Sequence, residues 1–188
     1  AAWLTAVLGA AGAWTLWRLR SSWPRWPTST FDRWLGALVS LGVALLVAAA
    51  LYPPTAFDGT MYHLPFAKAF VRADALPFLP DLRFPVFPQA TEVLYALGMI
   101  LGGGEGAAHL LGVLATALTA ALLFEWGREG FGAETGALAA ALWLGAPIVV
   151  YLAGTAYIEP MLGLYFTAAL LAADRFRTSG HRGLVPLA

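Results

Sequence analysis

The sequence predicts an all-α protein, a polytopic bundle of transmembrane helices with one long loop on the outer side of the membrane. Three observations predict this fold class. The 188 residues are 60% hydrophobic and only 12% charged, whereas soluble domains carry about 25% charged residues. Several apolar runs approach the roughly 20 residues that cross a bilayer. The arginines follow these runs in a pattern that can leave most of them on one side.

Five apolar runs are expected to cross the membrane, of which the last is the shortest. They are residues 1–19, 34–52, 107–124, 135–152 and 160–174. Residues 53–106 then form one outside loop, with short interfacial helices at about 65–74 and 89–101. The second of these is apolar, but about a dozen residues are too few for a span. We interpret residues 1–188 as a single membrane domain. Because the chain begins without Met and ends in the start of another apolar run, we expect it to be a fragment of a longer protein.

The distribution of cations predicts a side for each loop. If the apolar run near residue 95 does not cross, eight arginines share one side, which the positive-inside rule makes the cytoplasmic side. These are Arg18, Arg20, Arg25, Arg33, Arg128, Arg175, Arg177 and Arg182. The predicted location is therefore the cell inner membrane, multi-pass, with the long loop facing the periplasm or the exterior. The zero net charge indicates no nucleic-acid partner, and the absence of Cys excludes thiolate chemistry.

Prolines divide the outside loop into short pieces. In the first of its helices Pro65 occupies the first turn, where a missing N–H costs little. Phe66 and Phe70 share one face, on which this helix is expected to lie against membrane lipids. Lys68 and Arg72, four residues apart, share another face. These two cations fit either a phosphate or headgroup contact or ordinary snorkelling.

Asp58 and Glu159 are the two acidic residues that most favour a function. Asp58 follows the second apolar run, where a charge beside a membrane helix is costly and marks a candidate site. It could instead cap a helix, although that helix would then carry Pro65 beyond its first turn. Glu159 precedes Pro160, the expected first residue of the last span, and Glu is not a preferred cap. Both acids fall on the outside in the predicted topology.

An outside carboxylate admits two kinds of chemistry. It could act as a general base on an acceptor hydroxyl, or it could hold a divalent metal that bridges a phosphate. No cofactor is certain, and the question of a divalent metal stays open. His63 and His109 are available as ligands, but two histidines without a spacing motif are more often structural. Glu92 either complements a helix dipole or serves the site, and Tyr62, His63 and Tyr157 are candidate substrate-binding residues beside the acids.

Two segments carry a family resemblance. Residues 58–63, Asp-Gly-Thr-Met-Tyr-His, resemble the Asp-Glu-x-x-Tyr-Ala segment in the first periplasmic loop of GT-C fold glycosyltransferases, notably glycosyltransferase family 39 and the lipid A aminoarabinose transferases. Residues 154–160, Gly-Thr-Ala-Tyr-Ile-Glu-Pro, are similar to a Gly-Thr…Asp-Pro turn between two spans of that core. The order and spacing agree over about residues 34–177. Gly59 stands where the family has the second acid of its Asp-Glu pair, and Glu159 stands where the family has the Asp of its Asp-Pro turn. These differences leave the acceptor and any metal role open.

The resemblance implies a GT-C-like bundle and an integral-membrane glycosyltransferase. Such an enzyme moves a sugar from a polyprenyl-phosphate donor to a lipid, glycan or protein acceptor at the outer face of the cytoplasmic membrane. By this resemblance Asp58 is the catalytic base candidate, and Glu159, in the second matching segment, is the other catalytic candidate. Lys68 and Arg83 are the donor-phosphate candidates, with Arg72 a weaker third.

Two other classes of protein stay open. One is a transporter or flippase subunit in which Asp58 and Glu159 gate a polar pathway. That alternative predicts acids near mid-membrane and broken helices that point at a central site. The other is a non-enzymatic membrane scaffold, which leaves the charges of the outside loop unexplained.

Overall fold

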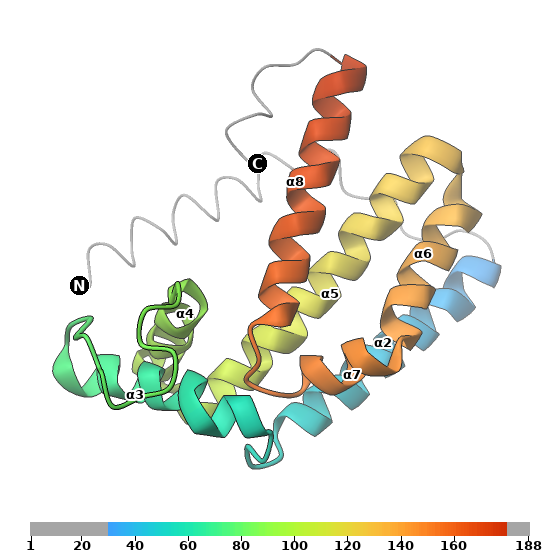
Figure 1. Ribbon diagram of the computed structural model, residues 1–188. Helices are drawn as coiled ribbons and strands as arrows, with labels where there is room; N and C mark the ends of the chain where they lie inside the picture. Colours follow the sequence, from blue (N-terminus) through green and yellow to red (C-terminus); the bar gives the residue numbers. More distant parts are fainter. Residues whose placement is uncertain (1–29, 180–188) are drawn as a thin grey trace. The chain divides into compact units, whose positions relative to one another are not determined.

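The computed structural model describes residues 30–179, and these residues form helices and turns without a strand (Figure 1). The all-α prediction is thereby confirmed. The chain divides into two compact units, residues 1–36 and 37–188, and the following description concerns the second. The predicted span 1–19 lies outside the described residues, as do four predicted cytoplasmic arginines. These are Arg18, Arg20, Arg25 and Arg182.

Helix α5 (Gly104–Phe131) is the central helix of the second unit. It packs against α6 (Ala133–Gly145), α7 (Pro147–Ala153) and α8 (Glu159–Ser179), and Figure 1 shows α8 running alongside it. Within residues 30–179, α5 is the one single helix that is long and apolar enough to cross a membrane. It extends beyond the predicted span 107–124 at both ends.

Two further predicted spans are present as helices of more limited apolar length. Helix α2 (Thr30–Ala50) covers most of the predicted span 34–52, and its apolar part is Val39–Ala50. Helix α8 covers the predicted span 160–174 and continues for about another turn. Neither meets the length and hydropathy of a membrane-crossing helix within the described residues. The multi-pass topology therefore stays a prediction.

The predicted span 135–152 forms two helices rather than one. Helix α6 ends at Gly145 and α7 begins at Pro147, with a bend of 65° between them. Pro147 has no N–H with which to continue the hydrogen-bond ladder, and the residue before a proline avoids the α region. Ala146 is accordingly extended, at φ −70° and ψ 119°. Taken together, the bent pair is long and apolar enough to count as a second crossing.

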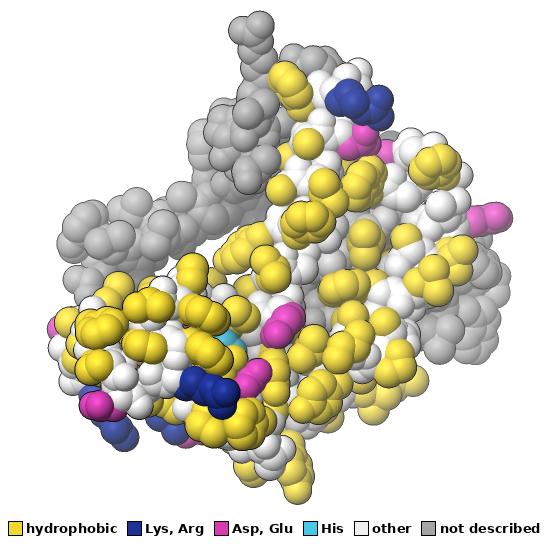
Figure 2. Space-filling model, in the orientation of Figure 1, with side chains coloured by type: hydrophobic (Ala, Val, Ile, Leu, Met, Phe, Trp, Pro, Cys, Tyr) yellow, Lys and Arg dark blue, Asp and Glu magenta, His cyan; other side chains and the backbone are white. Residues whose placement is uncertain are grey.

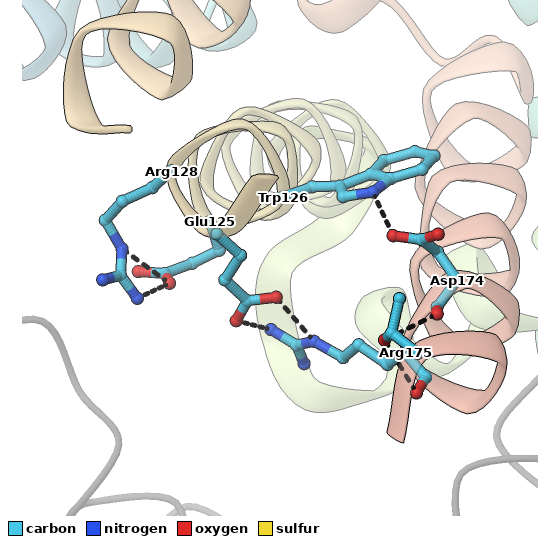
Figure 3. Close-up of polar contacts among 7 residues, drawn as sticks. Glu125, Trp126, Arg128, Asp174 and Arg175 are labelled. Carbon is cyan, nitrogen blue, oxygen red and sulfur yellow. Dashed lines mark hydrogen bonds and ion pairs between the residues drawn. The ribbon is translucent and has the colours of Figure 1, made fainter. Parts of the chain in front are cut away.

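Polar side chains join the C-terminal ends of α5 and α8 (Figure 3). The Arg175 guanidinium donates to both oxygens of Glu129, at 2.7 and 3.1 Å. The indole N–H of Trp126 donates to Asp174 at 3.0 Å (Figure 3). Since Arg128 lies on the same turns of α5 as these partners, the cations that follow α5 and α8 share one end of the bundle. The side of the membrane on which these cations lie stays a prediction.

Small residues allow α5 and α6 to approach closely. Gly132, at φ 99°, makes the turn between them in a conformation that favours glycine. A Cβ built on Gly136 would lie 2.3 Å from the carbonyl oxygen of Phe124, so only glycine fits there. Close backbone approach at small residues is how helices associate where the surroundings are apolar.

Residues 53–106, the predicted outside loop, are mostly helical. One helical stretch begins at Phe57 and passes through the π-helical segment η2 (Gly59–His63) into α3 (Leu64–Ala73). Helix α4 (Ala90–Gly98) follows and continues into the π-helical segment η3 (Met99–Gly103), which leads into α5. Short helices thus form at both predicted places, and α3 packs against α4, and α4 against α5.

The face of α3 that was expected to meet lipid meets protein instead. Phe66 and Phe70 are 1% and 4% exposed and belong to a core cluster with Tyr95 and Ala108. The reason is that α4 and the start of α5 supply an apolar surface of their own. Between α3 and α4 the large exposed apolar side chains are Leu76, Phe78, Phe84, Val86 and Phe87.

The close approach of α5 and α6 gives a test of the fold. Gly136→Ala places a methyl group against the Phe124 carbonyl, so we expect it to destabilise the protein by about 1–3 kcal/mol, as overpacking does. The measurement is thermal unfolding of the full-length protein in detergent. Gly130→Ala is the matched control, because nothing lies within 4 Å of a Cβ at Gly130. Equal unfolding temperatures for the two variants would contradict the observed packing.

Candidate active site

The site is built on η2, which places Asp58, Tyr62 and His63 on one helical stretch. Asp58 has helical backbone angles (φ −66°, ψ −38°) and its side chain makes no capping hydrogen bond. Pro65 lies beyond the first turn of this stretch, which the sequence argument considered unfavourable. The π-helical segment is where the chain accommodates it: the N–H of Leu64 bonds to the carbonyl of Gly59, five residues back. Such π-helical insertions occur frequently at functional sites.

The charges of Asp58 and Glu159 both raise the pKa of the Tyr62 phenol. Burial raises the pKa of Tyr62 to about 12, and the Asp58 carboxylate adds to this rise by its charge and by a hydrogen bond to the phenol. The charge of Glu159 raises this pKa further. Tyr62 and Glu159 line the same cavity, and Asp58 lies on the same helical stretch as Tyr62, about one turn before it. The two carboxylates of the sequence hypothesis, about a hundred residues apart in the chain, are thus brought to one place.

The turn between α7 and α8 is held against η2 by the loop. The Tyr95 hydroxyl donates to the carbonyl oxygen of Tyr157 at 2.7 Å. The backbone N–H of Asp58 approaches the Tyr157 hydroxyl at 3.4 Å. A Cβ built on Gly59 would lie 3.5 Å from the Cβ of Ala156, at van der Waals contact. These contacts set Glu159, the first residue of α8, beside η2.

His63 and Glu92 form a buried pair. The Nδ1 atom of His63 lies 2.6 Å from Oε1 of Glu92, with side chains 4% and 5% exposed. The second oxygen of Glu92, Oε2, is buried without a hydrogen-bond partner among the described residues. An unsatisfied buried acceptor costs about 1–3 kcal/mol, and a charged one costs more. Glu92 is thus paired with His63 and also lies in the first turn of α4, where an acid complements the helix dipole.

A cavity of about 220 Å³ opens beside this pair. Ten residues line it, from η2, α3, the segment before α4, α4 itself, and the turn before α8 with the first residue of α8. They are Tyr62, His63, Phe66, Phe84, Phe87, Pro88, Gln89, Glu92, Ile158 and Glu159. Figure 2 shows acidic side chains, a histidine and a basic side chain close together among hydrophobic ones on this face of the molecule. The cavity thus combines an aromatic wall with carboxylates.

The three cations of the loop are placed differently from one another. Lys68 forms an ion pair with Glu105 at the start of α5 and does not line the cavity. Arg83 lies over the ring of Phe84, 5.1 Å from its centre, and therefore borders the cavity. Arg72 is exposed and has no ion pair among residues 30–179. None of the three cations is among the residues that line the cavity, and Arg83 is the one that contacts a lining residue, Phe84.

A second cavity, of about 450 Å³, has Gly59 and Ala156 among its lining residues. It is lined mainly by the end of α2, the Pro53–Ala56 segment and the end of α7. His109 is among its lining residues and donates its Nδ1–H to the carbonyl of Ala50 at 2.9 Å, which agrees with a structural role. In the described part of the chain, no group of three or more potential ligands is arranged to hold a metal ion.

Comparisons with known proteins leave the family open. No protein-family model matches the chain, and no solved structure matches it significantly. An uncharacterised protein of Shigella flexneri is 45% identical to it over 65 residues, which are 35% of this chain and 32% of that protein. The match thus spans about a third of that relative's length, and the relative's description names no activity.

Sequence reasoning named most of the residues around Tyr62 and missed three. Tyr95 and the aromatic pair Phe84 and Phe87, whose rings stack at 4.7 Å, were not among the candidates. The clustering of Arg-Phe-Pro-Val-Phe-Pro at 83–88 is a signal that could have pointed to the pair. Tyr95 carried no such signal, because a tyrosine on an apolar helix is usually a core residue.

The environment of Tyr62 gives a spectroscopic test. We expect Asp58→Asn to lower the pKa of Tyr62 from about 12 toward the ordinary value of 10.0, because it removes a nearby negative charge. The measurement is the tyrosinate absorbance of the folded protein as pH rises, with a Tyr62→Phe variant subtracted to isolate this phenol.

The same shift predicts a pH-dependent stability. Since the folded state holds this proton more tightly than the unfolded chain, stability falls as pH rises between about 10 and 12. A Tyr62 titration that is the same with and without the Asp58 carboxylate would contradict the proximity of the two groups.

Proposed function

We propose that the chain is the catalytic part of an integral-membrane glycosyltransferase, which moves a sugar from a polyprenyl-phosphate donor to an acceptor hydroxyl at the outer face of the cytoplasmic membrane. The observation that carries the proposal is the convergence of Asp58 and Glu159 on Tyr62, beside an aromatic-walled cavity. These are the two acids that the resemblance to GT-C glycosyltransferases singled out. The two matching segments are also in contact, through Gly59 and Ala156.

The roles of the residues follow from their charges and positions. Asp58 accepts the proton of the acceptor hydroxyl while its oxygen attacks the anomeric carbon of the donor sugar. The bond from that carbon to the phosphate oxygen breaks, and polyprenyl phosphate leaves with the electron pair. Arg83, held over Phe84 at the border of the cavity, stabilises the charge of the leaving phosphate. Tyr62 keeps its proton at neutral pH and can donate a hydrogen bond.

The membrane topology is part of the proposal. It is supported by the hydropathy of α5 and of the bent pair α6–α7, and by the cations gathered at the end opposite the site. In this arrangement the loop that carries Asp58 faces the outside, and the turn after α5 faces the cytoplasm. Polyprenyl-phosphate sugars would then reach the site from the outer leaflet.

Cysteine labelling tests this topology, because the chain has no Cys of its own. Asp81→Cys lies in the outside loop, and Gly130→Cys lies at the end of α5; both positions are exposed. We expect a membrane-impermeant maleimide to label the first variant in right-side-out vesicles and the second in inverted vesicles. Labelling of both variants from the same side would contradict the predicted sidedness.

Asp58→Asn tests the chemistry. In the full-length protein we expect transfer of sugar from the lipid donor to fall by a factor of about 10²–10⁴, the usual contribution of a general base. The assay is the formation of the glycosidic product in membranes or nanodiscs. Asp74→Asn is the matched control: Asp74 is exposed at the end of α3 in a left-handed conformation (φ 50°), which asparagine also adopts. Full turnover in Asp58→Asn would remove Asp58 from the mechanism.

One observation favours the transporter or flippase alternative, namely the 65° break between α6 and α7, since broken helices are common in transporters. The break leads α7 toward the turn that precedes Glu159. The two functions differ in product: a transferase forms a new glycosidic bond in detergent solution, whereas a transporter needs a sealed membrane and leaves its substrate chemically unchanged.

A further inference from the structure

We infer that the cavity beside His63 and Glu92 is a subsite for one uncharged sugar ring, and that Glu92 Oε2 accepts a hydrogen bond from a hydroxyl of that ring. The inference rests on the proposed function for its biological setting, but its argument comes from the cavity alone. Nothing in the resemblance assigns Glu92, Phe84 or Phe87 a role.

The Oε2 atom of Glu92 is a buried hydrogen-bond acceptor that lacks a donor among the described residues. Glu92 lines the cavity and is buried, with Oε1 bonded to His63 and Oε2 without a partner among the described residues. Buried carboxylate oxygens are rarely left unpaired. A ligand in the cavity that offers a hydroxyl donor would satisfy Oε2. His63 keeps the other oxygen fixed, so the acceptor is already oriented before a ligand arrives.

The aromatic rings of Tyr62, Phe84 and Phe87 form part of the lining of the cavity. The rings of Phe84 and Phe87 stack at 4.7 Å with an angle of 10° between their planes, and Tyr62 meets Phe84 edge-on at 5.3 Å. Phe87 is 58% exposed although it lines the cavity, so part of its ring is open to a ligand. Phe84 is held at φ 59°, a conformation that a bulky residue adopts only under constraint. The apolar C–H face of a sugar ring fits such a surface.

The charge of the lining residues and the volume of the cavity restrict the ligand that it can hold. Glu92 and Glu159 line the cavity, no Lys or Arg is among its lining residues, and Asp58 lies close by. An anionic ligand is therefore disfavoured within it. The volume of about 220 Å³ is below the roughly 300–1,000 Å³ of pockets for drug-sized ligands, which suits a single ring. The phosphate of a lipid-linked sugar would remain outside the cavity, on the side of Arg83.

Binding of soluble methyl glycosides to the full-length protein in nanodiscs tests the inference without any transfer reaction. The probes are an uncharged methyl pentoside, an uncharged methyl hexoside and the methyl glycoside of a uronic acid, followed by ligand-observed NMR. We expect at least one uncharged glycoside to bind and the uronic acid glycoside not to bind, because of the carboxylates that line the cavity.

Two variants then locate the binding site. Glu92→Gln removes a charged acceptor and should weaken binding about tenfold. Phe87→Ala removes an exposed ring, leaves the buried pair untouched, and should weaken binding roughly threefold to tenfold. Phe78→Ala is the matched control, since Phe78 is a 66% exposed phenylalanine of the same loop that does not line the cavity; it should bind as the wild type does.

The outcomes separate this inference from the proposed function. Glycoside binding that is weakened in both variants supports the subsite even if no transfer activity is found. Absence of binding by every uncharged glycoside overturns the subsite even if the protein transfers sugar, and so does binding that is equal in the wild type and both variants. Preferential binding of the uronic acid glycoside also overturns it.

Discussion

The turn between α7 and α8, residues 154–158, must be packed against the outside loop, and the rest of the site depends on that contact. A turn inside a protein exposes backbone carbonyls that need donors. Here the Tyr95 hydroxyl, on a side chain that is fully buried, supplies the donor for Tyr157. The small residues Gly59 and Ala156 let η2 approach the turn to van der Waals distance. Without this contact, nothing would hold Asp58 and Glu159, which are far apart in the sequence, close together in space.

The bundle has two chemically different ends as a consequence. At one end the basic residues of α5 and α8 are paired with acids of the same helices, as between Arg175 and Glu129. At the other end Glu92 is paired with His63, Glu92 and Glu159 line the cavity, and Arg83 is not among its lining residues. Asp58 and Glu159 have no ion pair among residues 30–179, which leaves their carboxylates available to a ligand. We therefore expect chemistry at the loop end and topological anchoring at the other.

The sequence predicted the helical class and the positions of the outside helices, because hydropathy and proline placement are local signals. It also placed Asp58 and Glu159 on the same predicted side of the membrane, but it left open whether the two carboxylates face one groove. It did not predict that Phe66 and Phe70 face protein, because amphipathic periodicity does not distinguish a lipid face from a core face. The pairing of His63 with Glu92 and of Lys68 with Glu105 was also not predictable, since each joins helices whose packing depends on the tertiary fold.

The contact between η2 and the turn before α8 can be measured directly by disulfide formation. A Cβ built on Gly59 lies 3.5 Å from that of Ala156, and disulfides join Cβ atoms roughly 3.5–4.5 Å apart. In the Cys-free chain, we predict that the double variant Gly59→Cys, Ala156→Cys cross-links on mild oxidation. The pair Gly59→Cys, Gly130→Cys should not cross-link, because Gly59 lies near the start of α5 and Gly130 lies near its end. Failure of the first pair to cross-link, or equal cross-linking of both, would contradict the convergence of the two acidic segments.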